Sequence, residues 1–170
     1  REVKLLKHRQ PLATPQERKR PEGIATHPNE LWAWDITYLP TKVRGRFVYL
    51  YTCMDVFSRK IVGWRVEDEE SGHYASLLME KCILEEDTAG YGLCIHSDNG
   101  APMKSSTLKN TLDRLHVTTS LSRPGVSDDN AFPESLFRTL KYRPRYPKSH
   151  LDLEGWRAWV SGFVEWYNEE

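Results

Sequence analysis

The sequence lacks any apolar run long enough to cross a membrane, and it has no signal-peptide pattern. Its three cysteines, Cys53, Cys82 and Cys94, are an odd number without C-x-x-C spacing, so neither a disulfide framework nor a zinc site is expected. We predict that they are small buried side chains in a reducing compartment, and that the protein is cytoplasmic. A glycine-rich phosphate loop is also missing, so we expect no nucleotide cofactor.

The chain also has no net charge, because its 24 Lys and Arg residues balance its 24 Asp and Glu residues. The distribution is uneven: residues 1–20 hold seven Lys and Arg against two Glu, which leaves the remainder mildly acidic. Affinity for DNA would then have to come from local patches. The most basic patch runs from Arg123 to Lys148, with six basic residues against three acidic ones.

A chain of 170 residues is expected to bury one hydrophobic core. Residues 1–26 are basic and interrupted by prolines, which favours a flexible lead-in, whereas residues 27–170 are expected to form the folded domain. There is no initiator Met, and a helical pattern continues to the last residues. We therefore expect the chain to be a catalytic fragment of a longer protein.

The hydrophobic pattern changes from a period of two residues to helical spacing, which favours a mixed α/β domain. Aromatic and β-branched residues predict an antiparallel meander first, and a continuous apolar run predicts a strand buried on both faces. The last helix is expected to pack on the core in preference to forming a dimer face. The predicted strands are 31–39, 46–56, 59–67, 93–95 and 117–121, and the predicted helices are one capped by Ser71, one near 105–116, one carrying Glu134, and one near 152–169.

Three carboxylates are candidates for a metal site. Asp98 directly follows the buried strand at 93–95, at the end of a strand where ligand sites of open α/β sheets gather. Asp35 shares a strand face with Ala33 and Thr37, and an unpaired inward carboxylate there needs a partner or a metal. Glu134 lies early in a helix that Asp129 or Asn130 can cap. Carboxylate ligands favour Mg²⁺, with Mn²⁺ as a substitute.

Each candidate also has a simpler interpretation. Asp98 begins an Asp-Asn-Gly sequence, which taken alone would be an ordinary turn. Asp55, at the end of the second strand, is interpreted as a residue that satisfies the turn into Ser58, in preference to a metal ligand. His96 is interpreted as a packing residue or a support for the site.

The helix that carries Glu134 also predicts contact with DNA. Arg138 and Lys141 follow Glu134 by four and seven residues, so all three share one helical face. That face would place two phosphate-binding cations beside a metal-binding carboxylate. The alternative is a solvated face with ordinary pairing between acid and base.

These acids and their frames resemble the catalytic core shared by insertion-sequence transposases and retroviral integrases, the D,D,E recombinases with a ribonuclease H-like fold. The closest likeness is to transposases of the IS-three type, and it runs from about His27 to the last residue. The stretches that carry it are His96-Ser97-Asp98-Asn99-Gly100, Asp128-Asp129-Asn130-Ala131-Phe132-Pro133-Glu134, Asp55-Val56-Phe57-Ser58-Arg59-Lys60-Ile61-Val62-Gly63-Trp64, Ser122-Arg123-Pro124 and Leu140-Lys141-Tyr142-Arg143-Pro144.

The resemblance implies a ribonuclease H-like α/β fold, with a mixed sheet of three antiparallel and then two parallel strands flanked by helices. It also implies a DNA transposase that uses two metal ions to nick the 3′ ends of an element and to transfer the strands, acting as a homo-multimer on transposon ends and target DNA. Two alternatives stay open: a metal-dependent nuclease of the same superfamily, and a DNA-binding relic without catalysis. The implied catalytic and metal-binding residues are Asp35, Asp98 and Glu134, and the residues predicted to contact DNA are Arg123, Asn130, Arg138, Lys141 and Arg143.

Overall fold

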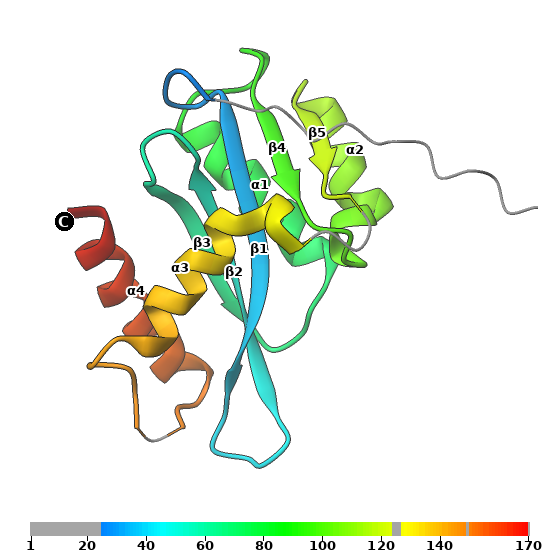
Figure 1. The fold of residues 1–170 in the computed structure, drawn as a ribbon. Coiled ribbons are helices and arrows are strands. Elements are labelled where there is room, and N and C mark those ends of the chain that lie inside the picture. Colours follow the sequence, from blue (N-terminus) through cyan, green and yellow to red (C-terminus); the bar gives the residue numbers. More distant parts are fainter. Residues whose placement is uncertain (1–24, 124–126, 149, 170) are drawn as a thin grey trace, which may run out of the picture.

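A five-stranded sheet forms the centre of the domain, with helices on both of its faces (Figure 1). The computed structural model describes residues 25–123, 127–148 and 150–169, so most of the predicted lead-in over 1–26 lies outside the described residues. In chain order the elements are β1 (Leu31–Pro40), β2 (Phe47–Asp55), β3 (Ile61–Glu67), α1 (Gly72–Glu85), β4 (Cys94–Ser97), the 3-10 helix η1 (Pro102–Lys104), α2 (Ser106–Arg114), β5 (Thr118–Leu121), the 3-10 helix η2 (Ser127–Asn130), α3 (Ala131–Tyr142) and α4 (Leu153–Glu169).

The strand order is β3-β2-β1-β4-β5, and it confirms the predicted fold class. β1 pairs antiparallel with β2, which pairs antiparallel with β3. β4 is parallel to both of its neighbours, β1 and β5. The third strand begins at Ile61 and not at residue 59 as predicted, because Arg59 adopts a positive φ of 68° inside the turn.

Alternating residues of β1 face two separate hydrophobic cores, as the period of two residues predicts. Trp32 and Trp34 are buried in the core on the side of α1 and α2. Ala33 and Leu39 point the other way, into the core formed with α3 and α4. Burying each large apolar side chain contributes about 1.5–3 kcal/mol. Asp35 and Thr37 therefore lie on the α3 side of the sheet.

Helix α1 begins at its predicted cap and packs very closely on β3. The Ser71 hydroxyl accepts a hydrogen bond from the Tyr74 amide at 3.4 Å. A Cβ placed on Gly63 would lie only 2.1 Å from the Cys82 sulfur, so this strand position requires glycine. Cys53 and Cys82 are buried as predicted, whereas Cys94 is half-buried, and none forms a disulfide.

Helix α4 packs on the sheet, which confirms its predicted role in the core. Trp156 is fully buried, and its indole nitrogen donates to the Pro40 carbonyl at 2.9 Å. The Asn168 amide both accepts from the Ile61 nitrogen, at 2.8 Å, and donates to the Ile61 carbonyl, at 3.0 Å. These hydrogen bonds attach one end of α4 to β1 and the other end to β3.

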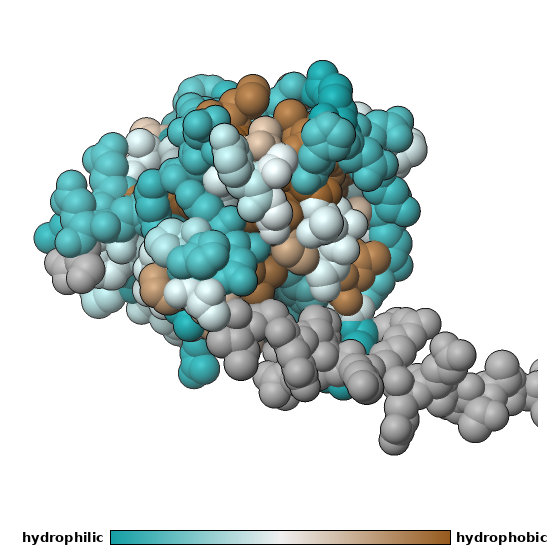
Figure 2. Space-filling model, turned by 90° about the horizontal axis from the view of Figure 1, so that it is seen from above, coloured by the Kyte–Doolittle hydropathy of each residue, from teal (hydrophilic) through white to brown (hydrophobic). Residues whose placement is uncertain are grey.

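The view from above in Figure 2 shows hydrophilic residues over much of that face, with hydrophobic residues in separate areas between them. Within the described part of the chain, no helix is long and apolar enough to cross a membrane.

Candidate active site

The parallel pairing of β1 and β4 brings Asp35 and Asp98 together. Ala33 lies opposite His96 in the register of this strand pair. Continuing that register by two residues places Asp35 opposite Asp98, just past the end of β4. Neighbouring strands lie about 4.8 Å apart, so two residues far apart in sequence become neighbours in space.

A tight turn holds the backbone that follows Asp98. The Asp98 carboxylate accepts a hydrogen bond from the Gly100 amide at 2.9 Å. A Cβ on Gly100 would lie 2.8 Å from the Met103 sulfur and 3.1 Å from the Asp98 carboxylate. The Asp-Asn-Gly sequence is thus a genuine turn, as its simpler interpretation says, and the turn also places Asp98 beside Asp35.

Helix α3 lies along β1 and carries the third acid. The Asn130 side-chain amide donates to the Trp34 carbonyl at 3.3 Å, and the Lys141 ammonium donates to the Thr37 hydroxyl at 2.7 Å. These contacts anchor both ends of the helix to the strand on either side of Asp35. Glu134 is exposed in the first turn of the helix, one turn after Asn130.

An ion pair fixes the approach to α3. The Arg123 guanidinium donates to both oxygens of the Asp129 carboxylate, at 2.8 and 2.9 Å, and the Arg123 amide donates to the same carboxylate at 2.8 Å. These bonds hold the pKa of Asp129 well below its usual range. The predicted capping is only partly correct: Asn130 occupies the cap position, but its side chain makes no capping bond.

Burial and like charges raise the pKa of Asp35 to about 7. Loss of solvation is the largest cause, and the negative charges of Asp98, Glu134 and Glu70 add to it, while the Ile36 amide acts in the opposite direction. Carboxylates that raise one another's pKa are the donor set that a divalent cation neutralises. The charges of Asp98 and Glu134 therefore act on Asp35. Glu70 acts on it as well, and the sequence analysis did not single out this acid.

The acids do not form a finished coordination sphere. Within residues 25–123, 127–148 and 150–169, no three His, Cys, Asp or Glu side chains lie close enough together to hold one ion. Like charges repel, and Asp35 and Asp98 each use an oxygen on a nearby backbone amide, of Ile36 and Gly100 respectively. The shared electrostatic effect thus reflects proximity, and these side chains would have to reorient in order to coordinate one ion together.

The structure places the residues predicted to contact DNA in different surroundings. Arg138 is exposed on α3, and Lys141 is half-buried over the ring of Tyr38. Arg143 stacks on Trp166, with its guanidinium carbon 3.6 Å from the ring centre. Arg123 is paired with Asp129, as described above. Asn130 is only 5% exposed.

Three of these residues also make contacts within the fold. Asn130 anchors α3 to β1 through its bond to the Trp34 carbonyl, and its contact with DNA stays a prediction. Arg123 and Arg143 hold parts of the fold together, because tertiary contacts that the sequence does not reveal occupy their guanidinium groups. Burial also lowers the pKa of Lys141, although the nearby Asp35 charge raises it. The contacts of all five residues with DNA stay predictions.

Asp55 satisfies the turn after β2, as its interpretation predicted. Its carboxylate accepts from the Asn29 amide at 2.9 Å, and from the Ser58 amide and hydroxyl at 2.7 and 2.6 Å. His96 is buried, and its ring nitrogens lie 3.0 and 3.2 Å from the hydroxyl oxygens of Ser120 and Ser122. Both residues therefore support the site from outside it.

Replacing Asp55 by Asn is expected to weaken folding while leaving activity per folded molecule nearly intact. The change puts an amide group where the Ser58 and Asn29 donors need an acceptor, at a side chain that is 1% exposed. Leaving a buried donor unsatisfied costs about 1–3 kcal/mol, which chemical denaturation can measure. Complete loss of metal-dependent DNA cleavage with unchanged stability would instead place Asp55 among the metal ligands.

Comparison with known proteins gives two family matches that together cover the described domain. A family model described as an integrase core domain matches residues 25–127, and a second model with the same description matches residues 115–170.

Curated relatives are similar over most of this chain. The transposase for insertion sequence element IS904 of Lactococcus lactis subsp. lactis (strain IL1403) is 41% identical over 120 residues, which is 69% of this chain and 45% of that protein. Transposase InsF for insertion sequence IS3fB of Escherichia coli (strain K12) is 29% identical over 141 residues, covering 83% of this chain and 48% of the relative. The chain thus spans about half the length of the curated relatives it matches.

A solved structure shares the fold. It is the cryoEM structure of the simian T-cell lymphotropic virus intasome in complex with PP2A regulatory subunit B56 gamma, with a TM-score of 0.58 and 21% sequence identity. The match covers 71% of this chain and 44% of that chain. At this level of identity the likeness supports the ribonuclease H-like fold and nothing finer.

Proposed function

Because this chain belongs to the integrase core domain family, we propose that it is the catalytic core of a DNA transposase, which nicks the 3′ ends of an element and joins them to other DNA. The resemblance to IS-three-type transposases is confirmed by the curated relatives. The single observation that supports the proposed chemistry is the β1–β4 register, which places Asp35 opposite Asp98, and the charges of Asp98 and Glu134 add to the raised pKa of Asp35. The names of the relatives support DNA as the substrate.

The three acids fit a divalent metal site. The negative charges of Asp98 and Glu134 act on the partly buried Asp35, and a divalent cation would neutralise this repulsion. We assign Asp35, Asp98 and Glu134 as the residues that would hold Mg²⁺, or Mn²⁺ in its place. Two such ions would activate the attacking oxygen and stabilise the leaving oxygen in an in-line displacement at phosphorus.

Residues of the chain itself would bind and orient the DNA strand. Lys141, held 2.7 Å from Thr37, puts a cation on the strand that carries Asp35, where it can hold a phosphate beside the acids. Water is the proposed nucleophile for nicking, and the freed 3′-hydroxyl for joining. A covalent protein–DNA intermediate is not part of this reaction, so no Tyr or Ser serves as a nucleophile. We also propose that two or more copies act together to hold both DNA ends.

A joining assay separates this proposal from its alternatives. The protein is incubated with a duplex whose element end already carries a free 3′-hydroxyl, together with a target duplex and Mg²⁺. A transposase core produces joined strands, whereas a nuclease of the same superfamily produces only cleaved ones. A DNA-binding relic retards DNA in a gel without either product. Products that form equally well in EDTA would overturn the metal-dependent reaction.

Replacing Lys141 by Ala is expected to weaken DNA binding by removing one phosphate contact, with little dependence on DNA sequence. The slope of log affinity against log salt should flatten by about 0.9 for duplex DNA. Titrations at several salt concentrations measure both quantities. Replacing Arg143 by Ala is the informative comparison, because its stacking on Trp166 predicts a loss of stability and a smaller change in slope. An unchanged affinity and slope for the Lys141 variant would remove Lys141 from the DNA interface.

A further inference from the structure

Two distant segments meet at the end of the molecule where the β1–β2 turn lies. They are the turn itself, residues 41–46, and the described parts of the connection from α3 to α4, residues 143–148 and 150–152. Thr41 and Leu151 form a parallel β-bridge, and the Lys42 ammonium lies 3.2 Å from the Asp152 carboxylate. Figure 1 shows the turn and the connection at the same lower end of the molecule, past the start of α4. We call these two segments the basic end.

The basic end carries a positive charge that the whole chain does not. Its two segments contain six Lys and Arg and one acidic residue, in a chain whose formal net charge is zero. Five of its basic side chains are exposed, and over the described residues four of these five form no ion pair, since only Lys42 is paired. These four residues are Arg44, Arg46, Arg145 and Lys148.

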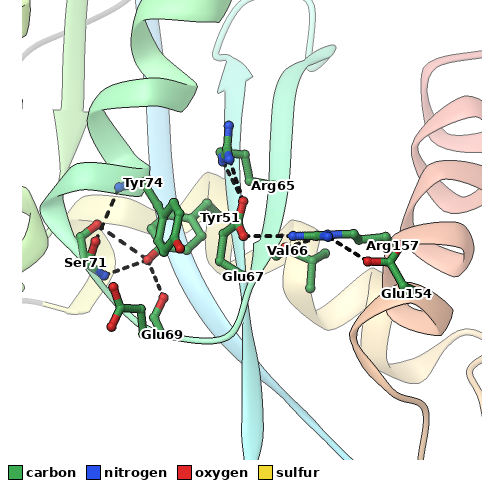
Figure 3. A network of polar contacts seen from close by, with 9 residues as sticks. All are labelled: Tyr51, Arg65, Val66, Glu67, Glu69, Ser71, Tyr74, Glu154 and Arg157. Atoms are coloured by element: carbon green, nitrogen blue, oxygen red, sulfur yellow. Dashed lines mark hydrogen bonds and ion pairs between the residues drawn. The ribbon is translucent and has the colours of Figure 1, made fainter.

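Neighbouring acids are already engaged. Asp152 pairs with Lys42, and its other oxygen accepts from the Gly155 amide at 2.9 Å. Glu154 pairs with Arg157 at 2.8 Å, and Figure 3 shows that this arginine also pairs with Glu67 on β3. These acids therefore do not neutralise Arg44, Arg46, Arg145 and Lys148, which can attract an anionic partner.

Hydrogen bonds hold the described parts of both segments in place. The turn is closed by hydrogen bonds from the Arg46 amide to the Val43 carbonyl, at 3.0 Å, and from the Thr41 amide to the Arg46 carbonyl, at 3.1 Å. The connection is held by the Trp159 indole, which donates to the Arg145 carbonyl at 3.2 Å. Binding at such a surface loses little backbone conformational entropy.

The basic end continues the face of α3 that begins at the candidate active site. Lys141 lies one residue before the end of this helix, and the connection starts directly after it. From Glu134 to Tyr142 the helix rises about 12 Å, the length of about three to four phosphates along one strand of duplex DNA. A duplex held at the acids and lying along α3 would then reach the basic end.

We propose that the basic end binds the phosphate backbone of duplex DNA that extends from the candidate active site. The inference rests on the proposed function, since it takes DNA at the acids as its starting point. Phosphates are favoured over unpaired bases because the one aromatic residue of the two segments, Tyr146, packs on Trp156 and Trp159 and offers no stacking surface. Contact with phosphates makes this binding independent of base sequence.

Salt titrations of paired variants test the proposal on the 170-residue chain. Arg44→Ala with Arg46→Ala changes one segment, and Arg145→Ala with Lys148→Ala changes the other. Each pair should flatten the salt slope for a duplex by about 1.8, so that a fourfold rise in salt costs each variant roughly twelve-fold less affinity than it costs the wild type. Lys109→Ala on α2 is the matched control, because it removes an exposed cation from a helix packed against α1 and should leave the slope unchanged.

The outcomes separate this surface from the proposed reaction. Wild-type slopes in both paired variants would overturn the basic end as a DNA site, even if metal-dependent joining is normal. A flattened slope in a protein that performs no metal-dependent cleavage or joining would keep the site and overturn the proposed function. A change seen only with single-stranded DNA would overturn the assignment to duplex phosphates. Melting curves should stay unchanged, since all four side chains are exposed.

Discussion

Replacing Asp98 by Asn is expected to reduce metal-dependent nicking and joining by at least about a thousand-fold, which corresponds to about 4 kcal/mol of lost transition-state stabilisation. Asparagine keeps the size of the side chain but removes the negative charge that would hold the metal. Asp35→Asn and Glu134→Gln should have the same effect, because the three acids act as one unit. Gel assays with a nicked or pre-cut duplex in Mg²⁺ measure the loss.

The matched control is Asp55→Asn, which removes a carboxylate from the neighbouring strand without touching the three acids. Its activity per folded molecule should stay near that of the wild type. Circular dichroism should show that the Asp98 variant folds normally, because among the described residues only the Gly100 amide donates to that carboxylate from the backbone. Near-normal joining by the Asp98→Asn protein would exclude this acid from the reaction.

In metal-free buffer above pH 7, the Asp35→Asn protein is expected to be more stable than the wild type, by about 2–4 kcal/mol. The pKa of Asp35 is about 7 in the folded protein, against an ordinary value of 3.8. The folded state therefore holds the proton more tightly than the unfolded state does. The wild type is stabilised by this proton at low pH, and it loses that stability as the pH rises from about 4 to 7.

Urea unfolding in EDTA at pH 5 and pH 8 measures this effect. The advantage of Asp35→Asn should be small at pH 5 and largest at pH 8. Adding Mg²⁺ at pH 8 should stabilise the wild type and leave the variant unchanged, because a ligand that binds only the folded state raises its stability. Glu134→Gln is a useful comparison, since this side chain is exposed. Equal stability of Asp35→Asn and wild type at pH 8 in EDTA would contradict the burial of a charged Asp35.

The sequence by itself determined the types of element and the identity of the candidate acids. Alternation along β1 correctly put Asp35 on the face opposite Trp34, because side chains in a strand alternate whatever surrounds them. The buried run before Asp98 and the Ser71 cap likewise depend on neighbours a few residues away. Such local patterns persist in the fold because their causes, backbone geometry and short-range hydrogen bonds, are themselves local.

Tertiary structure alone decided which charged side chains of the described residues are engaged by other residues of the fold. Arg123 and Arg143 share the basic stretch with Lys141, yet one pairs with Asp129 and the other stacks on Trp166. The fold also joins the β1–β2 turn to the connection after α3, through the contacts of Thr41 with Leu151 and of Lys42 with Asp152. Contacts between segments separated by tens of residues depend on how helices pack on the sheet, and local sequence patterns carry no record of that packing.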